Sequence, residues 1–252
     1  MNISELSELN YLKLSEVGPT DGLIGWWKLN GDIRDYSGYG NHGIFIGDPN
    51  VVSGIKNSAY NINGSPNSIT TRITDIHNIL NNSNDGITLS CWVKLNGAYY
   101  NDNGGILFGG NGYNWGLTYY KEKNKFSMEI WGDDGSKHSY TAYSNAGILE
   151  DTWYYVLGTL SNKGDLQIYV NGVLEGNGYV AKDIWFSDPI LRFGSRGDYW
   201  WVDSSICDGR LYNRILTDEE VMTLYKLVLG NSKVLFNKDG TIYVSGHIKE
   251  GL

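Results

Sequence analysis

The chain has 252 residues, of which 13% are aromatic, and its formal net charge is −8. This acidic balance excludes the basic surface with which nucleic-acid-binding proteins hold phosphates, and no apolar run is long enough for a membrane span. The 33 glycines predict many tight turns, and two cysteines, Cys91 and Cys207, are too few for a disulfide framework.

Residues 1–20 are predicted to form an N-terminal arm or attachment segment. Apolar residues recur at every third position from Ile3 to Leu12, ahead of a Gly18-Pro19 pair. This spacing fits either a short amphipathic helix that docks elsewhere or a frayed terminus. The segment carries acidic residues and lacks the apolar stretch of a signal peptide, so we expect a protein made without one.

The chain from Leu23 to Tyr212 has the pattern of many short strands separated by turn residues. The clearest strand covers residues 87–95, where apolar residues alternate with polar or aromatic ones and Cys91 takes an apolar position. Many short strands of this kind are the signature of a β-sandwich or jelly roll. Further strands are expected in residues 23–31, 42–47, 59–63, 68–73, 104–110, 114–120, 125–132, 138–143, 189–194 and 205–212, with a helical turn at residues 76–80.

Residues 151–176 have the pattern of a three-stranded antiparallel meander. Apolar residues alternate along residues 153–158 and again along residues 165–170. Asn171-Gly172 then marks a two-residue hairpin turn, because a type I′ turn needs a positive φ at both central positions. A meander with one apolar face is not stable alone, so a second sheet must cover it.

A helix and a hairpin are expected at the end of the chain. Thr217 and Glu220 have the spacing of a capping box, apolar residues follow at helical spacing, and Gly230 is the expected stop. Residues 231–252 hold two short apolar stretches around Lys238-Asp239-Gly240, which predicts a C-terminal β-hairpin. A lone hairpin is marginal in water, so we expect an assembly element and a homo-oligomer.

Five blocks follow one another in a specific order and spacing. They are GLIGWWKLNG with DYSGYGNHG (22–43), ITLSCWVKL (87–95), TWYYVLGTL with LQIYVNGVLEG (152–176), LRFGSR (191–196) and DGRLYNRILTDEEV (208–221). Together they resemble the LamG-like jelly roll of the concanavalin A-like lectin/glucanase superfamily. The resemblance implies an all-β, jelly-roll β-sandwich of two antiparallel sheets over residues 21–230. It does not imply one function, because this fold hosts glycan binders, adhesion modules and glycanases.

Residues 236–251, FNKDGTIYVSGHIKEG, are similar to hairpin segments at the ends of phage virion proteins. This similarity implies a virion surface component, such as a head fibre, tail fibre or decoration protein, made in the host cytoplasm without a signal peptide. Its partners would be a glycan or other cell-surface ligand and other virion proteins, with neither nucleic acid nor a membrane among them.

The family resemblance also implies a structural calcium ion near residues 30–41 and near Asp208. The loop offers oxygen ligands from Asn30, Asp32, Asp35 and Asn41, and calcium takes about six to eight oxygens. Two departures lower the charge of this site: Asn30 stands where an acid is common, and Cys207 precedes Asp208 where a second acid is usual. The alternative is that Asp35 and Asn41 build Asx turns.

Aromatic residues in turn-rich segments are the candidates for glycan binding, because sugars stack their C–H faces on aromatic rings. Residues 196–203, RGDYWWVD, are the most informative, since two adjacent tryptophans in a polar loop cannot both face a core. The alternative is that one tryptophan caps the core while the other lies on a neighbouring chain. The predicted ligand-binding residues are Tyr113, Trp115, Trp131, Arg196, Asp198, Tyr199, Trp200 and Trp201.

The sequence shows no catalytic pattern. Glycanases of this superfamily use two closely spaced acidic residues on one strand, whereas here Glu129 is followed by Trp131 at the alternate position. The four histidines are scattered, without a nucleophile or acid in a partner motif. We therefore predict a non-enzymatic carbohydrate-binding or adhesion module. The alternatives are a purely structural virion protein and a glycoside hydrolase.

Overall fold

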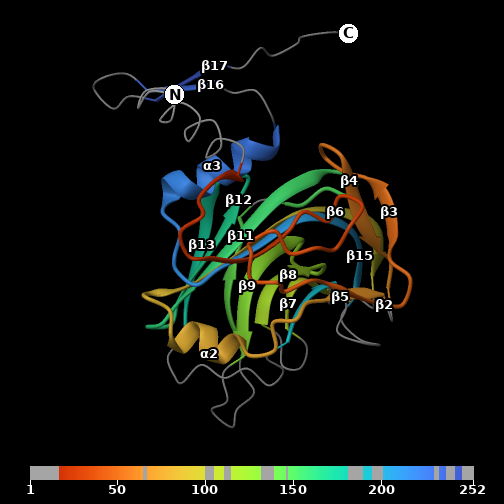
Figure 1. Ribbon diagram of the computed structural model, residues 1–252, viewed down its shortest axis with the longest axis horizontal. Coiled ribbons are helices and arrows are strands. Elements are labelled where there is room, and N and C mark those ends of the chain that lie inside the picture. The colour runs from red at the N-terminus through yellow and green to blue at the C-terminus, as the bar shows by residue number, and fades with distance from the viewer. Residues whose placement is uncertain are drawn as a thin grey trace.

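The computed structural model describes residues 17–64, 67–99, 105–110, 115–131, 139–145, 147–180, 190–194, 201–229, 233–236 and 242–245. Two antiparallel sheets lie face to face in it (Figure 1). This confirms the predicted all-β jelly-roll sandwich. None of the helices in these described stretches is long and apolar enough to cross a membrane.

The larger sheet, called sheet A, has eight strands within the described part of the chain. Its central strand β6 (Gly86–Tyr99) pairs with β11 (Trp153–Ser161) on one side and with β15 (Val202–Tyr212) on the other, and β1 (Leu23–Trp27) also pairs with β15. In spatial order the strands are β13 (Val173–Tyr179), β12 (Asp165–Val170), β11 (Trp153–Ser161), β6 (Gly86–Tyr99), β15 (Val202–Tyr212), β4 (Ser58–Ile62) and β3 (Asn50–Ser53), with β1 (Leu23–Trp27) beside β15.

The smaller sheet, called sheet B, has seven strands among the described residues. In spatial order they are β10 (Ser139–Tyr143), β9 (Lys125–Trp131), β8 (Trp115–Tyr120), β7 (Gly105–Gly110), β14 (Leu191–Gly194), β5 (Ser68–Thr70) and β2 (Ile44–Ile46). A short helix, α2 (Ile76–Asn81), connects β5 to β6. It confirms the helical turn predicted at residues 76–80, and the Asp75 side chain caps it by accepting from the Asn78 N–H.

The alternation predicted for β6 and the meander decides which side chains face sheet B. Cys91 and Leu89 of β6 are the register partners of Val156 and Gly158 of β11, so these four residues share one face of sheet A. A Cβ on Gly158 would lie only 2.7 Å from Met128 Sδ in sheet B. This is therefore the inner face, where Cys91 is fully buried and unbridged, as predicted.

The hairpin turn between β12 and β13 has the predicted geometry. Asn171 and Gly172 have φ values of 52° and 81°, which a type I′ turn requires. The Asn171 side chain also accepts a hydrogen bond from the Tyr155 N–H at 3.0 Å. The turn thus holds the meander in a single register, which keeps its apolar side chains on the inner face.

The two adjacent tryptophans of β1 lie on opposite faces of sheet A. Trp27 is fully buried between the sheets, with edge-to-face contacts to Phe108 and Phe193, which stack on each other at 4.1 Å. Trp26 lies on the outer face, where the Arg210 guanidinium covers its ring at 4.4 Å. The alternation of β1 therefore supplies one aromatic ring to each side of the sheet.

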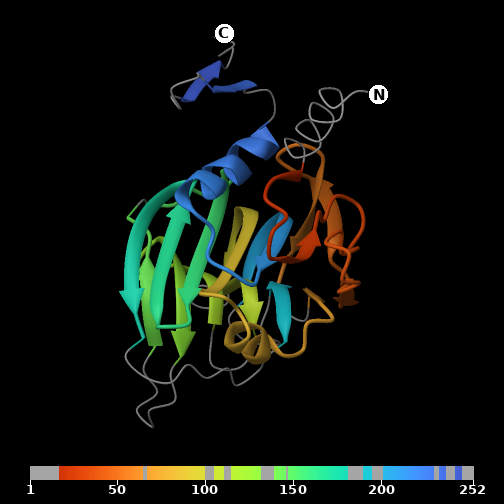
Figure 2. The same ribbon diagram turned by 60° about the vertical axis from the view of Figure 1, so that its left-hand side comes forward.

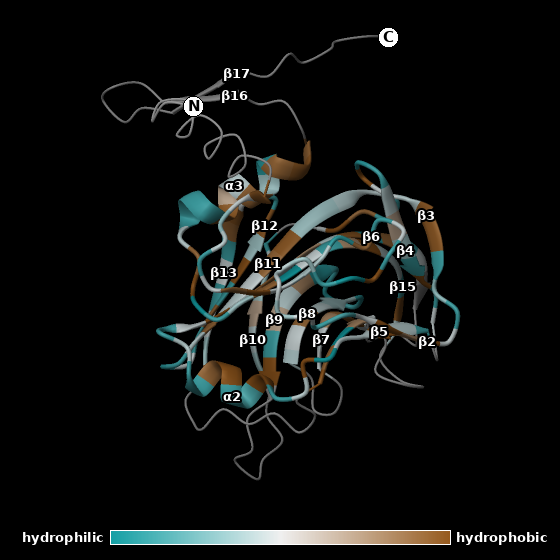
Figure 3. Ribbon diagram, in the orientation of Figure 1, coloured by the Kyte–Doolittle hydropathy of each residue, from teal (hydrophilic) through white to brown (hydrophobic). Residues whose placement is uncertain are grey.

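Helix α3 (Asp218–Leu229) covers part of the outer face of sheet A, at the end away from α2 (Figure 2). The predicted capping box is present, with Thr217 Oγ1 accepting from the Glu220 N–H at 3.3 Å and Glu220 Oε2 accepting from the Thr217 N–H at 2.9 Å. Figure 3 shows hydrophobic and hydrophilic residues along this helix. Tyr225 stacks on Trp92 of β6, with 5.7 Å between ring centroids.

The predicted C-terminal hairpin is also present. Strands β16 (Lys233–Phe236) and β17 (Ile242–Ser245) pair with each other in a separate two-stranded sheet. The predicted divisions at residues 20/21 and 230/231 stay predictions. At the start of the described chain, the carbonyl oxygens of Val17 and Pro19 accept hydrogen bonds from Arg210 and Tyr212 of β15.

Candidate functional site

The predicted calcium loop is held together by Asp35. This carboxylate is 7% exposed and accepts three backbone N–H groups: those of Trp26 at 3.0 Å, Ser37 at 2.8 Å and Asn41 at 2.8 Å. The Asn41 side-chain amide in turn donates to the Ile24 carbonyl at 2.9 Å. These contacts favour the Asx-turn interpretation of Asp35, because both of its oxygens organise the loop.

The other loop ligands are more exposed and make local contacts. Asp32 accepts from the Arg34 N–H at 3.0 Å and from the Tyr36 hydroxyl at 2.8 Å. That hydroxyl hydrogen bond raises the pKa of Tyr36 above its ordinary value. Asn30 is an exposed residue in the same loop.

Asp208, the remaining predicted calcium ligand, is paired with a cation of the chain itself. Its Oδ1 accepts the Trp26 indole N–H at 2.6 Å and two N–H groups of Arg210 at 3.2 Å each. Burial opposes the charge of Arg210, but the Asp208 carboxylate raises the pKa of Arg210 above its ordinary value. Asp208 has a positive φ of 48° at a bulge of β15, which turns it toward Trp26 and Arg210.

These residues do not fit a bound calcium ion. Asp208 Oδ2 is a buried oxygen without a hydrogen-bond partner, but it is one oxygen where calcium needs about six to eight. Across the described stretches, no group of three or more His, Cys, Asp or Glu side chains is placed to hold a metal. The calcium ion implied by the family resemblance stays a prediction that these contacts do not favour, and a chelator measurement tests it.

Among the predicted aromatic ligands, Trp115 needs a correction. It lies on β8 two residues before Leu117, and both side chains are fully buried in the core. A Cβ on Gly110 would meet the Trp115 indole nitrogen, so this ring packs over the neighbouring strand β7. Trp115 has no exposed ring face for a sugar, because strand alternation turns it inward with Leu117.

Five predicted ligand residues lie outside the described residues: Tyr113, Arg196, Asp198, Tyr199 and Trp200. Trp131 is described only through its backbone, as the last residue of β9. The assignment of these six residues to a binding site stays a prediction.

Trp201, the second tryptophan of the predicted pair, is partly exposed just before β15. Three of its ring carbons, Cδ2, Cε3 and Cζ3, lie 3.4 to 3.5 Å from the position that a Cβ on Gly64 would take. Nearly equal distances to three ring atoms place that position over the face of the indole. Gly64 thus leaves room for the ring, which packs flat on the chain just beyond β4.

Two residues beyond Trp201, Asp203 joins three strands of sheet A. Its Oδ1 accepts from the side-chain amides of Asn61 on β4 at 2.7 Å and Asn96 on β6 at 2.8 Å. The same Asn96 amide lies 3.3 Å from the Ser205 hydroxyl. We call Asp203, Asn61, Asn96 and Ser205 the Asp203 cluster; all but the buried Ser205 are partly exposed.

The Asp203 cluster lies on the outer face of sheet A. Ser205 pairs with Asn61 on one side and with Lys94 on the other, and Lys94 pairs with Trp153 of β11. These register partners share one face, and Trp153 is partly exposed at the end of the row. Sequence reasoning missed Asn61 and Asn96, because only the pairing of distant strands brings them to Asp203.

Glu129, the acid considered for catalysis, is fully buried on β9 and accepts the Tyr120 hydroxyl at 2.9 Å. Burial raises the pKa of Tyr120 above its ordinary value. The register partners of Glu129 are Gly116 and Thr141. Neither register partner is an acid, so the described strands place no second carboxylate directly across the sheet from Glu129.

A family model described as "Laminin_G_3: Concanavalin A-like lectin/glucanases superfamily" matches residues 65–222. Among curated proteins, none matches the chain. The chain resembles the binding domain of Paraclostridial Mosquitocidal Protein 1, with a TM-score of 0.66 and 18% identity over 86% of this chain and 54% of that one.

Two further structures are of botulinum neurotoxin. The binding domain of botulinum neurotoxin DC in complex with SialylT has a TM-score of 0.63 and 15% identity, over 88% of this chain and 55% of that one. The binding domain of botulinum neurotoxin serotype C1 has a TM-score of 0.63 and 17% identity, over 88% of this chain and 55% of that one. The chain thus spans about half of their length. By their names all three are binding domains.

Proposed function

We propose, from the premise that this chain belongs to the concanavalin A-like lectin/glucanase superfamily, that it is a non-catalytic module that binds carbohydrate. The binding surface is the Asp203 cluster with Trp201 beside it. One observation carries this proposal: Asp203 holds the amides of Asn61 and Asn96 in fixed positions across three strands, next to a partly exposed tryptophan.

The chemistry of this surface suits a sugar. A pyranose ring presents an apolar C–H face, which packs on an aromatic ring, and hydroxyl groups that both donate and accept hydrogen bonds. Within the described part of the chain, Asp203 Oδ2 has no hydrogen-bond donor, so it is available to a ligand hydroxyl. Since the amides are already oriented, little side-chain freedom is lost on binding.

The structural neighbours support the class of ligand. One of them is a complex with SialylT, and another is described by the interaction of botulinum neurotoxin type C with two ganglioside molecules. At 15% and 17% identity they share the fold with this chain, which spans about half of each. The assignment of glycan binding to this chain rests on its own Asp203 cluster.

The finer assignment is a surface component of a phage virion, such as a head fibre, a tail fibre or a decoration protein. It is supported by the similarity of residues 236–251 to virion hairpins and by the β16–β17 hairpin, which forms a sheet of its own. The same hairpin favours a second candidate function, a structural virion protein that assembles through its ends and binds no glycan.

A glycan-array screen of the full chain, with light scattering for its mass, tests both candidates. We expect saturable binding that Trp201→Ala and Asp203→Ala each weaken by about tenfold or more, as loss of a central contact does. Tyr39→Ala is the matched control, because Tyr39 is an aromatic residue of another loop and is 70% exposed. A homogeneous multimer without glycan binding would replace the lectin assignment by the structural one.

A further inference from the structure

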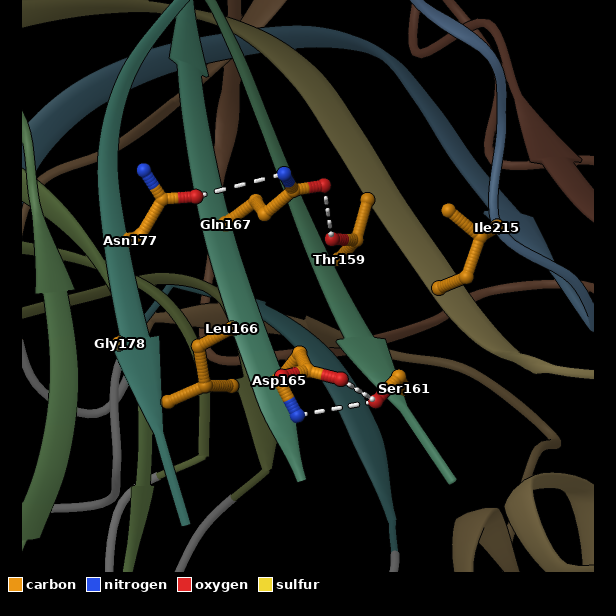
Figure 4. A pocket seen from close by; sticks show the side chains of 8 residues that line it. All are labelled: Thr159, Ser161, Asp165, Leu166, Gln167, Asn177, Gly178 and Ile215. Carbon is orange, nitrogen blue, oxygen red and sulfur yellow. Dashed lines mark hydrogen bonds between the residues drawn. The ribbon is translucent and has the colours of Figure 1, made fainter. Parts of the chain in front are cut away.

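The outer face of sheet A has a second polar area, at the end of β6 opposite to the Asp203 cluster. There β11, β12 and β13 form a hollow of about 350 Å³, with Ile215 at one side (Figure 4). Pockets for small-molecule ligands start at about this size. The polar side chains that line the hollow are Thr159, Ser161, Asp165, Gln167 and Asn177.

Strand β13 alternates glycine with larger residues beside the hollow. A Cβ on Gly176 or Gly178 would meet the backbone of Tyr143 or Thr141 in β10, so these positions admit the close approach of sheet B. Asn177, between the two glycines, and Tyr179, after the second, point to the opposite, outer side. The sequence EGNGY thus closes one edge of the sandwich and at the same time lines the hollow.

Hydrogen bonds fix the lining side chains relative to one another. Gln167 Nε2 donates to Asn177 Oδ1 at 3.3 Å, and Thr159 Oγ1 donates to Gln167 Oε1 at 3.4 Å. Nearby, Ser161 Oγ donates to Asp165 Oδ2 at 2.9 Å and accepts from the Asp165 N–H at 2.9 Å. Each of these bonds between side chains is visible in Figure 4.

This network leaves the donors of the Asn177 amide and one acceptor oxygen of Asp165 for a ligand. Among the described residues no acceptor takes the N–H groups of the Asn177 amide, and no donor reaches Asp165 Oδ1. A hydroxyl group is the ligand group that satisfies both, because it donates to a carboxylate and accepts from an amide. Apart from Asp165 the polar lining groups are uncharged side-chain hydroxyls and amides, a set that suits a ligand rich in hydroxyls.

An aromatic ring lies at the border of the hollow. Tyr179 is the register partner of Asp165, two residues along β13 from Asn177, and it is 59% exposed. These three residues share the outer face of the sheet. An exposed tyrosine beside hydroxyl-binding groups offers the stacking surface on which the C–H face of a sugar packs.

We propose that this hollow is a second carbohydrate site, which takes a neutral sugar between Tyr179 and the side chains of Asp165, Gln167 and Asn177. The site is distinct from the Asp203 cluster. Ser161 pairs with Gly86 at the start of β6, whereas Asn96 lies ten residues further along that strand. At about 3.3 Å per residue, the two areas are about 33 Å apart.

Titration of the ¹⁵N-labelled full chain with glucose, galactose and lactose tests this proposal by NMR. We expect saturable shifts of the Gln167 and Asn177 side-chain amide signals and of the β12 and β13 backbone. Asn177→Ala and Tyr179→Ala should each weaken this binding by about tenfold, and both change exposed side chains, so the fold should persist. Trp201→Ala should leave the response intact.

Asn57→Ala is the matched control, since Asn57 is an exposed asparagine at the β3–β4 turn, where only its backbone makes a hydrogen bond among those described. Spectra that do not change with any of the three sugars would overturn the proposal. So would shifts at β12 and β13 that persist unchanged in folded Asn177→Ala and Tyr179→Ala. Either result leaves the Asp203 cluster untouched, because its own variants test it separately.

Discussion

Asp208 and Arg210 form a charged pair against the Trp26 ring, and the Arg210 side chain is 1% exposed. Removing one partner of a buried pair leaves the other charge without compensation, which costs about 3–5 kcal/mol. We therefore expect Asp208→Asn to lower the free energy of unfolding by about 3 kcal/mol. Urea denaturation of the variant and the parent chain, followed by tryptophan fluorescence, measures this difference.

The Lys94–Asp151 pair supplies the control. Its atoms are 3.4 Å apart, but the Asp151 side chain is 83% exposed. Exposed pairs contribute between zero and about 1 kcal/mol, so Asp151→Asn should change the free energy of unfolding little. Equal losses in the two variants would contradict the special role of the buried pair.

The contacts of Asp35 and Asp208 also lead to an expectation for metal removal. Both oxygens of Asp35 accept backbone N–H groups, and Arg210 already balances the charge of Asp208. We expect EDTA to leave both the midpoint of thermal unfolding and glycan binding unchanged. A drop in the midpoint that added Ca²⁺ restores would instead establish the calcium ion implied by the family resemblance.

Single side chains were predictable from the sequence where strand alternation decides their place. The opposite faces of Trp26 and Trp27 followed from this rule, and so would the burial of Trp115, which shares a face with Leu117. The Asp203 cluster was not predictable, because Asn61 and Asn96 are 142 and 107 residues away from Asp203 in the sequence. Only the strand pairing brings such residues together.

At the level of elements, α3 depends on a carboxylate that also pairs with Arg214. Glu220 lies 2.6 Å from the Arg214 guanidinium while it caps the helix at Thr217. The hydrogen bond from Arg214 holds the pKa of Glu220 below its ordinary value. Because the pKa of Glu220 is lowered in the folded chain, its contact with Arg214 stabilises the fold fully at pH values above the unfolded-state pKa of glutamate, about 4.3. This stabilisation is lost as the pH falls through the lower pKa of the folded state.

We therefore expect Glu220→Gln to destabilise the chain by about 1 kcal/mol at pH 7, since the pair is partly exposed, and by less at pH 3. Glutamine keeps the capping hydrogen bond, so the difference isolates the charge. Glu219→Gln removes a neighbouring charge of the same helix turn and serves as the control. A loss that is equal at pH 7 and pH 3 would refute the assignment to the Arg214 pair.

Elements were predictable where a local signal fixes them. The Asn171-Gly172 turn and the Thr217–Glu220 capping box are examples, since each needs particular residue types at adjacent or nearby positions. Strand β3 (Asn50–Ser53) escaped prediction because three of its four residues are exposed, so it has no apolar alternation. The order of strands within each sheet was not predictable either, because it depends on pairings such as that of β15 with β6.

At the level of the whole molecule, the sandwich acts as a rigid support for its outer surface. Helix α3 and the chain from Val17 to Gly22 cover part of the outer face of sheet A, through contacts such as that of Tyr225 with Trp92. The Asp203 cluster and the hollow at Gln167 lie on the parts of this face that remain accessible. The fold is shared with the binding domains of the structural neighbours.

The length of β6 has a consequence for avidity. This strand of 14 residues runs the length of sheet A and fixes the separation of the Asp203 cluster and the hollow. With sugar bound at both places, as proposed, the two surfaces would act as a bivalent receptor, in which the first contact sets the effective concentration for the second. Such a receptor would select its target by spacing, because only a long glycan or a dense glycan layer reaches both surfaces at once.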